Sequence, residues 1–186
     1  MMMKTMLAVA TLASVVFCSS VPISAQNGDG WGRISNAAAR FKVLADFNSQ
    51  AVLDSETGLL WERSPGDTNG DGFVDQADRL DWAPAHLHCN NKVIGNRKGW
   101  RLPTIQELAS LIDPAAATPP NWANPAITMG HPFSVQITSY WSATNSAFYA
   151  QSAWYMFLGD GNVNPAPYNQ AALPWCVRFR QGVDAQ

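Results

Sequence analysis

The sequence predicts an α+β domain, and three observations lead to this fold class. Segments with strand character occur at both ends of the region that starts near residue 40, two segments with helical character lie between them, and no internal repeat is present. Separate runs of strands and helices, as opposed to a regular alternation, are typical of α+β folds. The chain has 186 residues, 47% of them hydrophobic, which suffices for one well-buried domain and is short for two.

Residues 1–25 predict a secretory signal peptide. Lys4 precedes the apolar run MLAVATLASVVF, and a segment rich in small residues ends at Ala25. The apolar run is shorter than the roughly 20 residues that span a bilayer, so no stable membrane span is expected after cleavage. An uncleaved anchor helix is the alternative, and a lipoprotein is disfavoured because bulky Phe17 precedes Cys18. We expect an exported protein that is periplasmic, on the cell surface or extracellular.

Cleavage would leave two cysteines, Cys89 and Cys176. An even pair in an exported chain predicts one disulfide, and two separate buried thiols are the alternative. In the chain-entropy description, closing so long a loop stabilises the fold by roughly 4 to 5 kcal/mol. The whole chain carries 12 basic and 14 acidic residues, and without a strong basic patch nucleic acid is not an expected partner.

The domain is expected to span residues 40–182, after a flexible, glycine-rich segment at 26–39. Its first strands are predicted at 40–47 and 51–63. The tetrapeptide SETG interrupts the second stretch, and its Gly58 suits a tight turn. This stretch is therefore predicted to fold as a hairpin.

Two helices are predicted in the middle of the domain. Asp81 is expected to cap a short helix that tolerates Pro84 in its first turn, where N–H groups lack intrahelical partners. The second helix follows Thr104, which forms a capping box with Glu107, and it ends before Pro114. The apolar face of this second helix carries Ile105, Leu108, Leu111 and Ile112.

The rest of the domain is predicted to contain a long surface loop and three strands. Residues 114–134 are rich in Pro, Ala and Asn, which favours a loop. Strands are predicted at 139–144, 153–159 and 174–180, with a turn at Asp160-Gly161 after the second of them.

The stretch DTNGDGFVDQAD, residues 67–78, predicts a calcium-binding loop. A loop of the EF-hand type places oxygen ligands at positions 1, 3, 5, 7, 9 and 12 and a glycine at position 6. Gly72 takes the glycine position, and Val74 can anchor the loop to the domain. A solvated acidic turn is the alternative, since Asp, Asn and Gly also favour turns. The predicted ligands are Asp67, Asn69, Asp71, the main-chain carbonyl of Phe73, Asp75 and Asp78.

The last ligand, Asp78, is one methylene shorter than the usual glutamate. In this it resembles the loops of dockerin modules, but dockerins carry two such loops and this chain has one. A docking role is therefore disfavoured. We expect a calcium-ordered insertion with a modest affinity, suited to extracellular calcium near the millimolar range.

Several motifs outside this loop carry a family resemblance. AVLDSETGLLWER, DWAPAHLHCNN, GWRLPTIQELASLID, YWSAT, AWYMFLGDG and WCVRF occur in the order typical of the Legionella collagen-like protein C-terminal domain family. The chain is similar to this family over roughly residues 40–180, and its WRLPT…EL segment is distinctive. The family is otherwise a domain of unknown function, common in exported bacterial proteins.

The resemblance implies a C-type-lectin-like fold, with two helices on a twisted antiparallel or mixed sheet and a long loop region. It also implies that Cys89 pairs with Cys176. The namesake member resembles an adhesin and binds sulfated glycans, but activity carried over on fold alone is an analogy. The G-X-Y stalk of that member has no counterpart in this sequence.

Sugar-binding C-type lectins ligate calcium through an EPN or QPD triplet and a WND triplet, and none of these occurs here. A calcium-bridged sugar site of that type is therefore not expected. Tryptophan offers another route to sugars, because indole faces stack on sugar rings. Trp61, Trp82, Trp100 and Trp141 fall within the family motifs and are expected in the core. Trp122, in the polar long loop, is the candidate ligand-binding aromatic.

No catalytic arrangement is predicted. His86 and His88 would point about 200° apart on a helix, so they are expected to be surface residues and not a shared metal site. Formylglycine-generating enzymes share the lectin-like fold but need redox-active cysteines, which here are expected to form a structural bridge. Arg101 is expected to pack or pair structurally, and Glu107 to serve as a capping residue.

These features together predict an exported, non-catalytic binding module that recognises a glycan or a cell-surface protein and contains a structural calcium loop. The alternative is a structural or assembly component of the envelope without a small ligand, and an enzyme of the formylglycine-generating type is less favoured. An exposed cluster of aromatic or basic residues within 114–134 and 145–170 would favour the binding module.

Overall fold

The structure, a computed structural model, describes residues 36–116 and 124–181. The predicted signal peptide at 1–25, most of the segment 26–39 and the candidate ligand residue Trp122 lie outside these residues. None of the helices in the described part of the chain is long and apolar enough to span a membrane.

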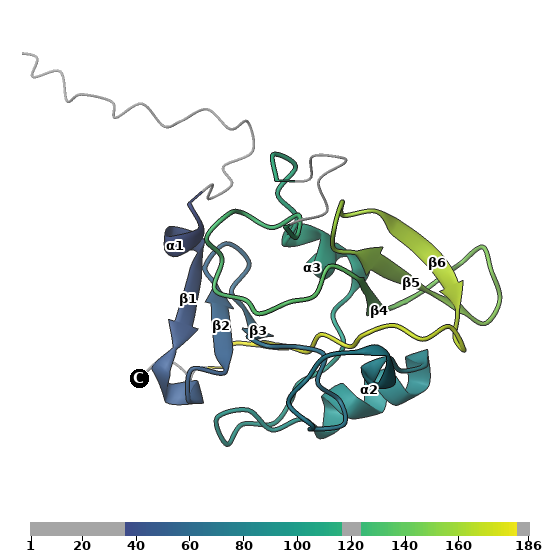
Figure 1. The fold of residues 1–186 in the computed structure, drawn as a ribbon, viewed down its shortest axis with the longest axis horizontal. Coiled ribbons are helices and arrows are strands. Elements are labelled where there is room, and N and C mark those ends of the chain that lie inside the picture. Colours follow the sequence, from purple (N-terminus) through teal and green to yellow (C-terminus); the bar gives the residue numbers. More distant parts are fainter. Residues whose placement is uncertain (1–35, 117–123, 182–186) are drawn as a thin grey trace, which may run out of the picture. The chain divides into compact units, whose positions relative to one another are not determined.

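The first of two antiparallel sheets joins the two ends of the domain (Figure 1). Its strand order is β1-β2-β3-β7, so the last strand pairs with the third. The predicted hairpin is confirmed as β2 and β3, and Gly58 at its turn has a φ of +72°, which a glycine adopts without steric cost. The strands are β1 (Phe41–Leu44), β2 (Ala51–Asp54), β3 (Leu59–Glu62) and β7 (Val177–Phe179).

The second sheet has the order β4-β5-β6. β4 (Ser139–Asn145) and β5 (Ser152–Phe157) confirm two of the predicted strands. β6 (Val163–Pro167) is missing from the prediction, because its sequence VNPAP contains two prolines that cannot donate to a ladder. Such a strand is tolerated at the edge of a sheet, which is where β6 lies.

The predicted flexible segment 26–39 differs from the structure at its end, where residues 36–39 are ordered in a helical turn. Helix α1 (Ala37–Arg40) begins after Asn36, whose side chain accepts the N–H groups of two following residues. Arg40 is buried, and its guanidinium donates to both carboxylate oxygens of buried Asp54 at 3.0 and 2.8 Å. A third bond, 2.7 Å long, runs to the carbonyl of Ser110. These contacts hold α1 against β2 and α3 and order the start of the domain.

The two predicted helices are confirmed as α2 (Trp82–Asn91) and α3 (Ile105–Ser110). Asp81 is the N-cap residue of α2, but its side chain makes no capping hydrogen bond. The Thr104 capping box of α3 is present in full. Two short 3₁₀ turns, η1 (Ala45–Phe47) and η2 (Gln76–Asp78), complete the elements.

Two clusters of buried side chains form the core. The first gathers Trp61, Trp175, Tyr140 and residues of α3 between the two sheets, and the second surrounds the Cys89–Cys176 disulfide. Three of the four tryptophans expected in the core, at positions 61, 100 and 141, are fully buried, whereas Trp82 is half-buried.

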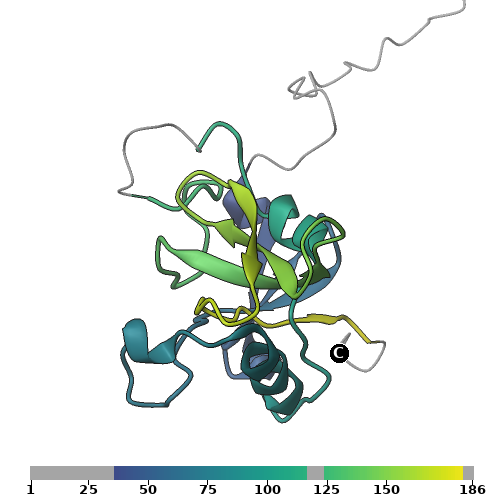
Figure 2. The ribbon, with the colours of Figure 1, turned by 90° about the vertical axis from the view of Figure 1, so that its right-hand side faces the viewer.

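The segment before β7 links the parts of the domain. It passes between helix α2 on one side and the sheet of β4, β5 and β6 on the other (Figures 1 and 2). The predicted disulfide joins Cys89 of α2 to Cys176 of this segment, with the two Cα atoms 5.4 Å apart. The described part of 114–134 is irregular, as predicted, but it is not a surface loop throughout. Ala126, Ile127 and Phe133 are buried, and the last two pack in the first core cluster.

Reduction of the disulfide is expected to destabilise the domain strongly. The bond spans 87 positions of sequence, and releasing so long a loop should lower the free energy of unfolding by about 4 kcal/mol. Denaturant unfolding of the protein with and without reductant measures this change, and the double variant Cys89→Ala with Cys176→Ala should match the reduced protein. An equal unfolding midpoint in oxidised and reduced protein would contradict the expectation.

Candidate functional site

The aspartate loop, residues 67–78, is organised by its own side chains. The two carboxylate oxygens of Asp67 accept the N–H groups of Gly70 at 2.7 Å and Gly72 at 3.1 Å. Both glycines have positive φ angles, +80° and +89°, so the bends that bring these N–H groups to Asp67 suit glycine. Asp71 in turn accepts the N–H of Phe73 at 2.9 Å.

Asp78 anchors the C-terminal end of the loop. Its carboxylate is fully buried and accepts the N–H groups of Thr68 at 2.7 Å, Asn69 at 3.3 Å and Asp75 at 2.9 Å. Burial by itself would raise the pKa of Asp78, but these backbone donors outweigh burial and lower its pKa. Asp78 therefore holds the two ends of the loop together as a charged carboxylate.

The donor set of the loop suits a hard cation in its chemistry. Carboxylate, amide and main-chain carbonyl oxygens are the ligands that calcium prefers. An oxygen that accepts one N–H, as both oxygens of Asp67 do, retains a further lone pair, whereas Oδ1 of Asp78 already accepts three hydrogen bonds. In residues 36–116 and 124–181, however, no three His, Cys, Asp or Glu side chains are gathered as a metal site. Calcium binding by Asp67, Asn69, Asp71, Phe73, Asp75 and Asp78 stays a prediction.

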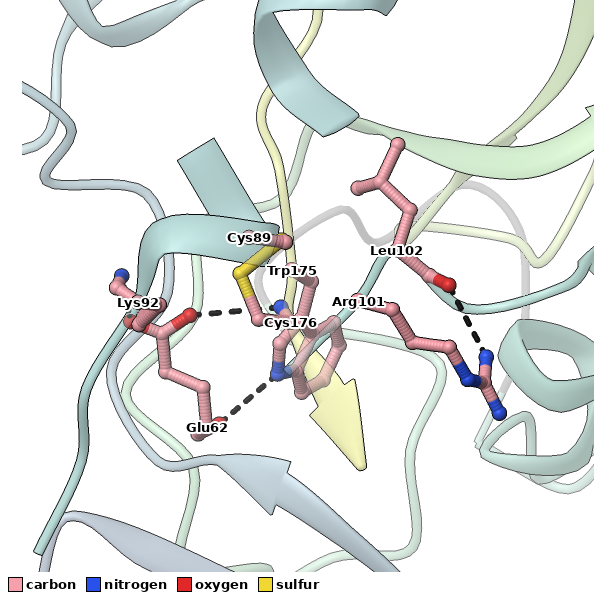
Figure 3. The surroundings of a disulfide bond; sticks show 7 residues. All are labelled: Glu62, Cys89, Lys92, Arg101, Leu102, Trp175 and Cys176. Carbon is pink, nitrogen blue, oxygen red and sulfur yellow. Dashed lines mark hydrogen bonds and ion pairs between the residues drawn. A yellow bond between two sulfur atoms is a disulfide. The ribbon is translucent and has the colours of Figure 1, made fainter. Parts of the chain in front are cut away.

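The disulfide lies in a structural setting (Figure 3). Glu62 next to it is nearly buried and pairs with Lys92 at the end of α2. Glu62 also accepts the indole N–H of Trp175 through its main-chain carbonyl at 2.9 Å. Burial raises the pKa of the Glu62 carboxyl, and the Lys92 charge opposes this effect. These contacts link β3, α2 and the segment before β7.

Arg101 and Glu107 have the structural roles expected of them. The guanidinium donates twice to the carboxylate, at 2.8 and 2.7 Å, and also lies 4.7 Å from the ring centre of Phe179. Glu107 at the same time completes the capping box of α3. Its pKa is lowered, because the bonds from Arg101 and Thr104 outweigh the effect of burial.

The two histidines of α2 are half-buried, whereas surface positions were expected for them. His86 meets Trp82 edge-on, with ring centres 4.4 Å apart. Desolvation lowers the pKa of both, and that of His88 falls to about 4 with a further contribution from the Lys92 charge.

Aromatic side chains are exposed in the β4–β5 loop, and a stacked aromatic pair lies beside the base of this loop. Phe148 and Tyr149 in that loop are 85% and 60% exposed. Tyr168 stacks on Trp82, with ring centres 4.5 Å apart and planes 13° from parallel. The Tyr168 hydroxyl donates to the side chain of Asn145 at 3.0 Å, which connects the stacked pair to the base of the loop. We call Phe148, Tyr149, Tyr168 and Trp82 the aromatic surface.

Phe148, Tyr149 and Tyr168 lie in the range 145–170, where an exposed aromatic cluster was expected to mark a binding module, but none of them was predicted as a ligand residue. One further signal for them is present in the chain. Between Asp113 and Arg178 only Asp160 carries a formal charge. The second sheet and its loops are therefore almost free of charge, and the exposed aromatics stand on this uncharged background. Trp122, the aromatic that sequence reasoning selected, lies outside the described residues.

Together these features define an α+β domain cross-linked by one disulfide, with an aspartate loop and an aromatic surface. The sequence model of one family, the Lcl C-terminal domain, matches residues 50–178. The chain belongs to this family, whose function is not known, as the ordered motifs predict. No curated protein matches the chain.

Histidine titration provides a test of the packing of α2. Because the folded-state pKa of His88 is about 4 and an unfolded histidine titrates near about 6.5, the unfolded chain binds the proton first. Stability should therefore fall as the pH drops from about 6.5 towards 4. NMR titration of the histidine rings should give a His88 midpoint near pH 4. His88→Gln should reduce the slope of the stability profile in this window and leave the part that comes from the lowered pKa values of His86 and His131. A His88 midpoint near 6.5 would contradict the expectation.

Proposed function

We propose that the protein is an exported, non-catalytic binding module that recognises a glycan at the cell envelope through the aromatic surface. The observation that carries this proposal is the exposure of Phe148 and Tyr149 in adjacent positions of one loop. Large exposed apolar side chains, when grouped, mark interaction sites in soluble domains. Aromatic side chains are also enriched among the residues that dominate binding energy.

The chemistry of this surface favours a sugar over a charged partner. The region from residue 114 to 177 contains one formally charged residue, Asp160. It can therefore contribute little charge complementarity to a charged partner. Flat aromatic faces bury apolar area, and the hydroxyl of Tyr149 adds a polar group at the rim. A sugar ring presents both an apolar face and hydroxyl groups, which matches this combination.

The disposition of the cysteines supports a role without catalysis. Formylglycine-type chemistry would need reactive thiols, and Cys89 and Cys176 are both fully buried and joined to each other. Carboxylate–cation pairs such as Arg40 with Asp54 and Arg101 with Glu107 hold secondary structure in place. The charged side chains of these pairs therefore have a structural role and need no catalytic one.

We further propose that the aspartate loop binds calcium and that the ion has a structural role. The loop is closed by hydrogen bonds to Asp67 and Asp78, which leaves several carboxylates close in sequence. A divalent cation would offset their mutual repulsion. None of the predicted calcium ligands is among the residues of the aromatic surface, so the proposed role of the ion is to stabilise the domain and not to bind the sugar.

The aromatic surface can be tested on a glycan array with the protein lacking residues 1–25, in the presence and absence of calcium. The double variant Phe148→Ala with Tyr149→Ala should weaken binding at least tenfold, because about 1 to 3 kcal/mol of burial is removed for each exposed aromatic that becomes covered. Leu87→Ala, which removes another exposed apolar side chain, is the matched control and should bind normally. If no glycan binds under either condition, the envelope-assembly role replaces the binding role.

The calcium loop can be tested by thermal unfolding. Millimolar calcium should raise the melting temperature by several degrees relative to chelator, because an ion that binds only the folded state stabilises it. The double variant Asp67→Ala with Asp71→Ala should abolish this rise. Asp160→Ala removes an aspartate that accepts a nearby backbone N–H in the same way, and it should retain the rise. Equal melting temperatures with calcium and with chelator would refute the loop as a calcium site.

A further inference from the structure

A cleft of about 290 Å³ lies beside the aspartate loop, apart from the residues of the aromatic surface. One of its walls comes from residues 74–79, the end of the loop and the residue after it, and the other from residues 136–138 just before β4. Val74 and Leu173 supply apolar contact area. The polar side chains that line the cleft are Asp75, Gln76, Arg79, Gln136 and Thr138.

Arg79 is the cation of this cleft and is half-buried. Within the described residues, its guanidinium has one hydrogen-bond partner, the hydroxyl of Thr138. Arg40 and Arg101 instead each meet a carboxylate through two hydrogen bonds. A guanidinium carries five N–H donors, so Arg79 keeps donors for a further acceptor in the cleft.

Two exposed carboxamides, those of Gln76 and Gln136, also line the cleft. The side-chain amides of Gln76 and Gln136 make no hydrogen bond to residues 36–116 or 124–181. The backbone of Gln136 is nevertheless held firmly, since its N–H donates to the hydroxyl of buried Tyr140 at 2.9 Å and its carbonyl accepts from it at 3.1 Å. The backbone of Gln136 is thus held in position, and its side-chain amide can form hydrogen bonds with a ligand in the cleft.

The charges of the cleft select the kind of ligand. The aspartate loop has four carboxylates and stays net negative with one divalent ion bound. Beside Arg79, an anion is therefore attracted by the guanidinium and repelled by the loop, whereas a cation is repelled by Arg79 and attracted by the loop. An uncharged ligand avoids both costs. Hydroxyl groups donate and accept hydrogen bonds, so they can pair with both the guanidinium and the two amides.

We propose that this cleft binds one uncharged saccharide residue by direct hydrogen bonds from Arg79, Gln76 and Gln136, without a bridging metal ion. The proposal rests on the glycan-recognition function and adds a polar subsite to it. Because part of the aspartate loop forms one wall of the cleft, any ion that orders the loop should also change the affinity for the saccharide. The two affinities must then change by the same factor in both directions.

Amide-resolved NMR provides the test. The protein lacking residues 1–25 is titrated with glucose, galactose, mannose and N-acetylglucosamine, and with glucuronate as a charged counterpart. At least one neutral sugar should shift the side-chain amide signals of Gln76 and Gln136 more than those of other residues. Gln136→Ala and Arg79→Gln should each weaken this binding about fivefold, the change expected for a lost hydrogen bond. Gln106→Ala, an exposed glutamine of α3, should leave it unchanged.

The outcomes separate this proposal from the aromatic surface. The variant Phe148→Ala with Tyr149→Ala should keep the amide shifts in the cleft even where it loses glycan-array binding. If no sugar of the panel shifts the two amides, the cleft proposal is wrong, whatever the array shows. Tighter binding of glucuronate than of every neutral sugar would overturn the choice of an uncharged ligand. Shifts that persist undiminished in well-folded Gln136→Ala and Arg79→Gln proteins would place the sugar elsewhere.

Discussion

The buried segment 172–178 is the constraint on which the rest of the domain depends. Each of its residues is buried, so its backbone groups need partners inside the protein. Leu173 exchanges hydrogen bonds with β4, Val177 exchanges them with Arg101, and Ala172 does so with Leu80. Cys176 adds a covalent bond to α2. The segment can be buried only when both sheets and the helix are in place around it.

Buried polar groups connect this frame to its outer parts. Arg40 with Asp54 fastens the first helical turn to β2 and α3, and Glu62 with Lys92 fastens β3 to α2 beside the disulfide. A buried ion pair adds little net stability, but removing one partner is costly because the other charge is left unpaired. These pairs therefore specify the arrangement of elements more than they strengthen it.

The surface of the domain divides by chemistry. Charged residues gather before residue 114, and the second sheet with its loops is nearly uncharged and carries exposed Phe148 and Tyr149. The cleft with Arg79 combines residues from the charged part, including the end of the aspartate loop, with residues 136–138 from the uncharged part. A rigid frame with loops that differ in polarity is a common way for one fold to support different binding sites.

Local sequence determined the features of this protein that depend on neighbouring residues. The hairpin at Gly58, the Thr104 capping box, the turn at Asp160-Gly161 and the shape of the aspartate loop follow from glycine φ freedom and side chain-to-backbone hydrogen bonds. The count of two cysteines in the expected mature chain indicated the disulfide, and the ordered motifs indicated the family.

Only the tertiary structure decided the features that join distant residues. β6 forms despite its prolines because an edge strand needs few donors, and α1 is ordered because Arg40 reaches Asp54. Tyr168 stacks on Trp82, although the two residues are far apart in the sequence. Gln136 and Arg79, also distant in the sequence, line the same cleft. No local pattern specifies such contacts, because they arise from how the sheets and helices pack around the buried C-terminal segment.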